Sequence, residues 1–225
     1  MLTLWSTSIG KKVVLAITGF ILTAFVIGHM LGNLKVFQGE GEFNGYAVWL
    51  REVGGPAVGY GQMLWLARLV VLTSTLLHVV AAAQLTRMSH AARPVSYERK
   101  QAIEATYASR TMRWGGLIIT LFMIYHLLHF TFGAVGYAPG QYRPMSVYRN
   151  VVIGFSVWYV SAFYITAMIA LGLHMYHGVW SAFQTLGLNN ARTNSVYRAL
   201  ATVSSLTVVL GNVSVPMAVL AGMVR

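Results

Sequence analysis

The chain is poor in charge and lacks two residue types that carry much of the chemistry of soluble proteins. Only 9% of its 225 residues are charged, and it contains no cysteine and no aspartate. A soluble domain carries roughly 25% charged residues, so this chain could not cover a soluble surface. The absence of cysteine excludes a disulfide, a Cys-ligated zinc and an iron–sulfur cluster held by this chain alone. The sequence therefore predicts an integral membrane protein.

The charges that are present are mostly basic, and the formal net charge is +11. Such a charge does not indicate a nucleic-acid-binding protein here, because the basic residues punctuate apolar runs instead of sharing one solvated face. They delimit five long windows without charge.

These windows predict an all-α integral membrane bundle of five transmembrane helices, because one crossing takes about 20 apolar residues. The whole chain, residues 1–225, forms a single domain in this prediction. The expected helices cover approximately residues 13–34, 63–87, 112–136, 151–184 and 197–223. The fourth window is too long for one crossing, so its helix is expected to protrude from the bilayer. A short surface helix is expected around residues 98–107.

The distribution of lysine and arginine predicts the orientation. With the N-terminus in the cytoplasm and the C-terminus outside, ten basic residues lie on the inner side and five on the outer side. The inner set is Lys11, Lys12, Arg87, Arg93, Arg99, Lys100, Arg110, Arg113, Arg192 and Arg198, and the outer set is Lys35, Arg51, Arg143, Arg149 and Arg225. Arg68 lies inside the outer half of the second helix, where it either snorkels to the interface or pairs with a haem propionate.

Six of the seven histidines fall within the first four predicted helices, and only His90 falls in a loop. Ionisable groups at membrane depth are costly and indicate function. At about 1.5 Å per residue, His29 and His126 lie roughly 24 and 20 Å from the inner boundary, whereas His78 and His174 lie roughly 13 and 15 Å from it. Two histidines at equal depth on neighbouring helices can ligate one haem iron from both faces. The depths thus predict an outer and an inner pair.

Two of these histidines have a second histidine three residues further on, and spacing alone does not choose between them. His126 is followed by His129, and His174 by His177. Residues three apart share one helix face, so either member could be the ligand, and the other could bind a propionate, a quinone or a backbone carbonyl. A quinone also needs a nearby proton donor or acceptor, for which Glu52 and the segment 6–12 are weak candidates.

Five segments together resemble a known family. They are STSIGKKVVLAITGF at 6–20, FVIGHMLGNL at 25–34, STLLHVV at 74–80, TMRWGGLIITLFMIYHLLHF at 111–130 and GLHMYHGVWSAFQTLG at 172–187. In order and spacing, over nearly the whole chain, they are similar to the cytochrome b558-type membrane anchor of succinate dehydrogenase (succinate:quinone oxidoreductase), the dihaem, five-helix type.

The resemblance implies a function for the chain as the quinone-reactive subunit of a respiratory complex II in the bacterial cytoplasmic membrane. It implies two haem b groups, a distal one on His29 and His126 and a proximal one on His78 and His174, with His177 dispensable. It also implies a flavoprotein subunit and an iron–sulfur subunit as partners, and a quinone, often menaquinone, as substrate. The sequence does not decide between one complex and a higher oligomer of it.

Three alternatives differ in chemistry. The first is the anchor of a quinol:fumarate reductase, in which some relatives carry a glutamate two residues before the fourth-helix ligand; this chain has Gly172 there. The second is a proton-coupled transporter with a histidine relay, which would need carboxylates in the spans. The third is a haem-free anchor whose histidines only pack. The sequence favours succinate oxidation through two haems.

Overall fold

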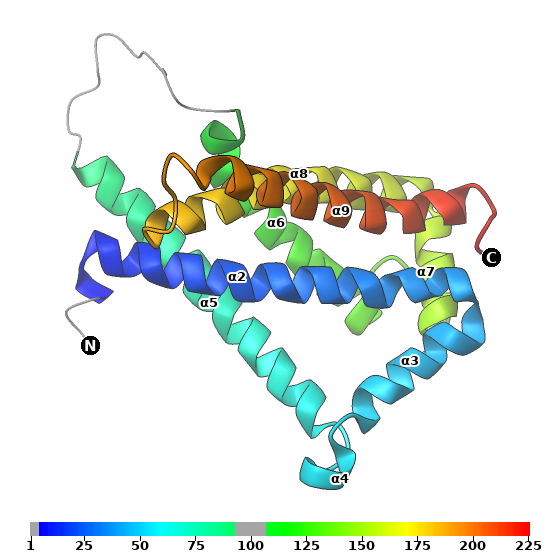
Figure 1. The fold of residues 1–225 in the computed structure, drawn as a ribbon. Coiled ribbons are helices and arrows are strands. Elements are labelled where there is room, and N and C mark those ends of the chain that lie inside the picture. The colour runs from blue at the N-terminus through cyan, green and yellow to red at the C-terminus, as the bar shows by residue number, and fades with distance from the viewer. Residues whose placement is uncertain (1–4, 93–106) are drawn as a thin grey trace.

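Five long helices, each apolar enough to cross a membrane, make up most of the molecule (Figure 1). The structure is a computed structural model that describes residues 5–92 and 107–225, and these residues form helices and connecting turns without a strand. The long helices are α2 (Ser8–Asn33), α5 (Gln62–Ala91), α6 (Tyr107–His126), α8 (Trp158–Thr185) and α9 (Asn194–Leu220). The predicted all-helical, multi-pass membrane fold is thereby confirmed.

The helix α2 has a well-defined start and end. The Thr7 side chain accepts a hydrogen bond from the Gly10 backbone N–H at 3.0 Å, which satisfies one of the amides that a helix N-terminus leaves unpaired. At the other end a 3₁₀ turn, η1 (Leu34–Gln38), leads to Gly39 at φ 96°. This left-handed residue reverses the chain into α3 (Glu40–Glu52), and α4 (Gly55–Val58) follows. Both short helices lie in a connection where none was predicted.

The third predicted helix ends earlier than expected. Beyond His126 the chain makes one π-helical turn, η2 (Leu127–Thr131), instead of continuing to residue 136. Gly133 then adopts φ 62°, and a Cβ on it would lie 2.2 Å from the Tyr142 ring. A left-handed glycine ends a helix, and here the packed tyrosine ring leaves room for glycine only.

The fourth predicted helix, 151–184, is two helices, so the expectation of one protruding helix was wrong. Val157 has extended backbone angles and separates α7 (Val147–Ser156) from α8. The Ser161 hydroxyl donates to the Phe155 carbonyl at 2.6 Å, which gives this carbonyl a partner where the helical ladder is interrupted. As a result α7 lies crosswise at one end of the bundle (Figure 1).

Two smaller expectations also changed. His90 was assigned to a loop but lies in the last turn of α5 and accepts a hydrogen bond from Arg113 Nη1 at 2.9 Å. The surface helix expected at 98–107 falls outside the described residues except for Tyr107, which begins α6.

The two ends of the bundle are called the N-terminal end, where α2 begins, and the C-terminal end, where α9 ends (Figure 1). The N-terminal end holds the start of α2, the last turns of α5 and α8, and the start of α9. The C-terminal end holds α3, α7 and the end of α9. In the centre α8 packs against α9, α6 and α2, while α5 packs mainly against α2.

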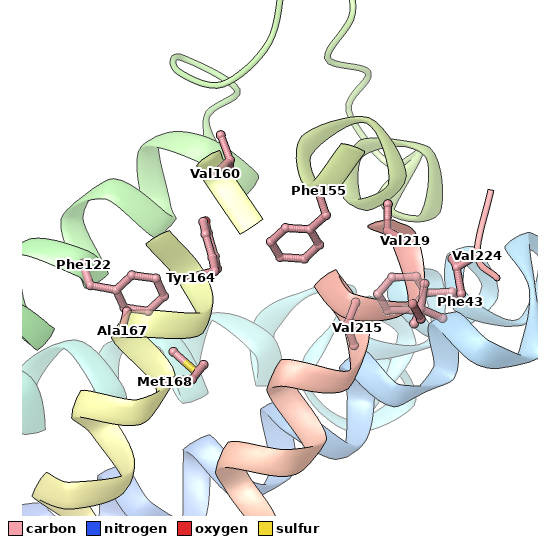
Figure 2. Packing of buried hydrophobic residues seen from close by; sticks show 12 residues of the cluster. Phe43, Phe122, Phe155, Val160, Tyr164, Ala167, Met168, Val215, Val219 and Val224 are labelled. Atoms are coloured by element: carbon pink, nitrogen blue, oxygen red, sulfur yellow. The ribbon is translucent and has the colours of Figure 1, made fainter. Parts of the chain in front are cut away.

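The larger hydrophobic core lies toward the C-terminal end. Figure 2 shows Tyr164 of α8 near Phe122 of α6 and Phe155 of α7, and each of those ring centres lies 5.0 Å from the Tyr164 ring centre. A smaller cluster of Met30, Met175 and Val208 joins α2, α8 and α9. The buried aromatic rings thus surround the first turns of α8, where Tyr164 is only 5% exposed.

Candidate functional site

The structure brings the four predicted ligand histidines together in two pairs. The ring centres of His29 on α2 and His126 on α6 lie 5.8 Å apart, and those of His78 on α5 and His174 on α8 lie 6.2 Å apart. The first pair lies nearer the C-terminal end and is called the C-end pair; the second is called the N-end pair. The pairing expected from helical rise is therefore the one that the fold produces.

The separations suit a metal ion between two imidazoles. A metal ion lies about 2.0–2.1 Å from each ligating nitrogen, and each nitrogen lies about 1 Å from its ring centre, which together place the ring centres roughly 6 Å apart. Edge-on contact of two rings also occurs at such distances. The angles between the ring planes are 86° and 60°, and two imidazoles could hold one metal at either angle, because each ring plane can rotate about its metal–nitrogen bond.

The number of ligands distinguishes among kinds of metal. Across the residues that the structure describes, no group of three or more His, Asp or Glu side chains could hold an ion. A bare zinc site needs three or four protein ligands. A site with two histidines suits a metal that brings its other ligands in a macrocycle, as haem does. The residues present therefore fit haem better than a free ion.

In the C-end pair, His126 has a hydrogen-bond partner for its Nδ1. The Tyr164 hydroxyl lies 3.4 Å from it. A ligating histidine usually bonds one ring nitrogen to a partner and the metal through the other. The other member, His29, keeps an exposed side chain, and Phe25 stacks on it with ring centres 5.4 Å apart.

In the N-end pair, His78 is held in a comparable way by Thr18 of α2. The Thr18 hydroxyl lies 3.0 Å from His78 Nδ1 and also 2.7 Å from the Val14 carbonyl oxygen, to which it donates. The His78 Nδ1–H can therefore donate to the threonine oxygen, which leaves Nε2 for a metal. The partner ring, His174, has a buried Nδ1 without a hydrogen-bond partner.

Two glycines give the N-end pair its clearance. A Cβ on Gly19 of α2 would lie 3.5 Å from His78 Cε1, and a Cβ on Gly116 of α6 would lie 3.8 Å from His174 Cε1. A Cβ at either position would be in ordinary contact with the ring, and only a longer side chain would reach into the space beside it. A flat ligand that lies across two imidazoles needs such clearance, so these glycines are consistent with a haem site.

The structure also separates the members of each histidine doublet. His129 is 0% exposed, and a Cβ on Gly136 or Gly154 would lie 2.7 Å from its Nε2. No room is left for a metal at that nitrogen, so His129 is a core residue. His177 does not face His78; its ring contacts Trp180 of the same helix at 6.3 Å between centres. His126 and His174 are thus the doublet members that face a histidine on another helix.

The remaining sequence candidates lie near the ends of the spans. Arg68 stacks over Trp65 of its own helix at 4.8 Å, and Glu52 is exposed in the last turn of α3. In the segment 6–12, Lys11 is only 6% exposed and donates to the Trp5 carbonyl. The geometry brings none of these three to either histidine pair, and their roles stay predictions.

Sequence reasoning missed Thr18, Tyr164, Gly19 and Gly116. The only signal for the first two was a polar group within an apolar helix, which is common.

Comparisons with protein-family models, with curated proteins and with solved structures find no match for this chain.

Proposed function

We propose that the chain is the membrane anchor and cytochrome b subunit of a succinate:quinone oxidoreductase. In this proposal His29 and His126 hold one haem b, and His78 and His174 hold a second. The observation that carries it is the close approach of two imidazoles from different helices at each of two depths. Haem, when bound, supplies a one-electron carrier at each pair.

The residues of this chain do three things in the proposed function. The four histidines present imidazole nitrogens from four different helices to the two sites. Thr18 and Tyr164 hold Nδ1 of His78 and His126, which fixes ring orientation. Within a bilayer, the apolar helices together with lipid, which would cover the exposed His29, keep water away and leave the rings in a low-dielectric environment, which influences the reduction potential of a bound metal.

The proposed orientation places the N-terminal end of the bundle in the cytoplasm and the C-terminus outside, in a bacterial cytoplasmic membrane. The N-terminal end presents exposed basic side chains at Lys12, Arg87, Arg113, Arg192 and Arg198. Such a face can dock a flavoprotein subunit and an iron–sulfur subunit, and it also suits anionic lipid. These partners would supply electrons from succinate, and a quinone, such as menaquinone, would accept them.

One packing contact supports succinate oxidation over quinol-driven fumarate reduction. A Cβ on Gly172 would lie 2.4 Å from Val209 Cγ2 of α9, so the carboxylate that some fumarate-reducing relatives carry has no room here. All five acidic residues of the sequence lie outside the five spans, which disfavours a proton-coupled transporter.

The test is the haem content of the purified full chain in detergent. We expect a dithionite-reduced minus oxidised spectrum with b-type bands and two haems per chain. A helical, correctly assembled preparation without such bands, also when co-expressed with its partner subunits, would refute the proposal. Proton flux into liposomes by a haem-free preparation would point to the transporter instead.

A further inference from the structure

A tyrosine hydroxyl joins the proposed ligand His126 to the buried His129. The Tyr164 oxygen on α8 lies 3.4 Å from His126 Nδ1 and 3.0 Å from His129 Nδ1. The two histidines come from the end of α6 and from the π-helical turn η2 that follows it. This π turn presents both Nδ1 atoms to one phenol, which lies on a different helix.

When His126 binds a metal through Nε2, the phenol hydrogen of Tyr164 has a partner among these three groups in only one arrangement. The His126 Nδ1 then carries the hydrogen and must donate, so the Tyr164 oxygen is the acceptor. A phenol has a single hydrogen, and Tyr164 then donates it to His129 Nδ1. The resulting chain runs from His126 through Tyr164 to His129, and each step has one donor and one acceptor.

The surroundings hold this chain in place. Tyr164 is 5% exposed and His129 is 0% exposed, so water does not compete for either hydrogen bond. Phe130 stacks on the His129 ring at 4.1 Å between centres, and Tyr137 covers it at 4.9 Å. Gly136 and Gly154 close the remaining space around Nε2. Because His129 cannot turn, its Nδ1 stays directed at the tyrosine oxygen.

We infer that Tyr164, whose hydroxyl is held in place by its hydrogen bond to His129, is a positioning residue. It orients His126 and makes the His126 imidazole more electron-rich as a metal ligand. This inference rests on the proposed haem function. A hydrogen bond accepted from Nδ1–H raises the basicity of a ligating imidazole, and a more basic ligand favours the ferric over the ferrous state. Tyr164 therefore lowers the reduction potential of the haem at the C-end pair only.

The test compares Tyr164→Phe with Tyr125→Phe in the full chain with haem bound. Tyr125 belongs to the same aromatic cluster, with its ring centre 6.1 Å from that of Tyr164, and its hydroxyl makes no hydrogen bond to a histidine among the described contacts. The readout is a spectroscopic redox titration that resolves the two haems. The haem lost in His126→Leu identifies the one at the C-end pair.

We expect Tyr164→Phe to keep both haems and to shift the ferric–ferrous equilibrium of the C-end haem roughly tenfold toward ferrous, which is about 59 mV upward for one electron. The other haem and the Tyr125→Phe protein should keep their potentials. His129→Leu should also raise the C-end potential, because Tyr164 loses its acceptor. His129→Gln, whose amide oxygen can accept, should partly restore the potential.

Four outcomes would overturn the inference. An unchanged C-end potential in Tyr164→Phe would show that the phenol only packs, while the haem proposal itself would stand. Equal shifts of both haems would indicate a general structural effect. A wild-type chain without haem would refute the proposed function and this inference together. If Tyr164→Phe failed to fold, identical potentials in His129→Leu and His129→Gln would also count against the inference.

Discussion

The two histidine pairs differ in what holds the second ring nitrogen. At the C-end pair, His126 bonds to a tyrosine from another helix, and that tyrosine bonds to a fully buried histidine. At the N-end pair, His78 bonds to Thr18, whose hydroxyl turns back to the backbone of its own helix. The His126 ring is thus hydrogen-bonded within a network of side chains, whereas the His78 ring is linked through Thr18 to the backbone of a helix.

The packing around the two histidine pairs also differs. The larger hydrophobic core, with its buried aromatic rings, packs around Tyr164 of the C-end network (Figure 2). Buried polar atoms without a partner occur at both sites: His174 Nδ1 and His177 Nδ1 at the N-end pair, and His129 Nε2 in the C-end network. Such atoms are costly, and only at the N-end pair does one of them belong to a proposed ligand. The two sites should therefore respond differently to substitution.

The largest expected effect comes from removing one ligand of each pair. His126→Leu and His174→Leu should each lower the haem content from two per chain to one, because a single imidazole holds a haem less tightly and leaves one side of the iron without its ligand. The measurement is haem per protein, with the remaining haem assigned by its potential. His177→Leu, one helical turn from His174, is the matched control and should retain both. Loss of both haems in either ligand variant would show that the sites are not independent.

A smaller effect is expected at Thr18. Thr18→Val has nearly the same shape but loses the hydrogen bond to His78, and loss of such a partner typically lowers metal affinity 10- to 100-fold. We expect about tenfold weaker haem retention at the N-end pair in a competition assay with apomyoglobin, with the C-end pair unaffected. Thr18→Ser keeps the hydroxyl and should behave like wild type. A tenfold loss in Thr18→Ser as well would attribute the effect to packing.

The smallest effect concerns pH and the loop above the C-end pair. The Tyr137 hydroxyl donates to the Asn150 carbonyl at 3.0 Å, and the Tyr142 hydroxyl lies 3.1 and 3.0 Å from the Phe130 and Thr131 carbonyls. Burial raises the pKa of both phenols, and for Tyr137 the neighbouring Tyr142 adds to this.

A raised pKa in the folded chain means that the unfolded chain loses these protons first, near pH 10. The stability that the two phenols contribute is thus complete below pH 10 and falls as pH rises from there toward their folded pKa. Thermal unfolding in detergent between pH 8 and 11 should show this fall, and Tyr137→Phe should make it shallower. A fall of the same steepness in Tyr137→Phe and wild type would contradict the assignment.

How far the sequence predicts the site depends on the kind of geometry involved. The depth of His29, His78, His126 and His174 follows from helical rise and the alternating direction of the spans, so their pairing was predictable. Rotation about a helix axis was not, and this is what separates His126 from His129. The π turn after His126 and the packing of Gly136 and Gly154 around His129 decide it, and the helical period of the sequence predicts neither.

The fold, like the site, has features that the sequence predicted and features that it did not. Charge-free windows predicted five spans, because the cost of charge in a bilayer acts on each segment separately. The break at Val157 and the early end of α6 were missed. The break depends on the hydrogen bond from Ser161 to Phe155, and the early helix end depends on Tyr142 packing on Gly133. The periodicity of hydrophobic residues predicts neither contact.

The contact between Gly172 and Val209 has a consequence for how this chain can change over time. A Cβ at residue 172 would lie 2.4 Å from Val209 Cγ2 and 3.9 Å from the Ser205 carbonyl oxygen. A side chain gained at 172 therefore requires the Val209 side chain to shift or to be replaced by a smaller one. Positions 172 and 209, one on each helix, are thus coupled by a single steric contact.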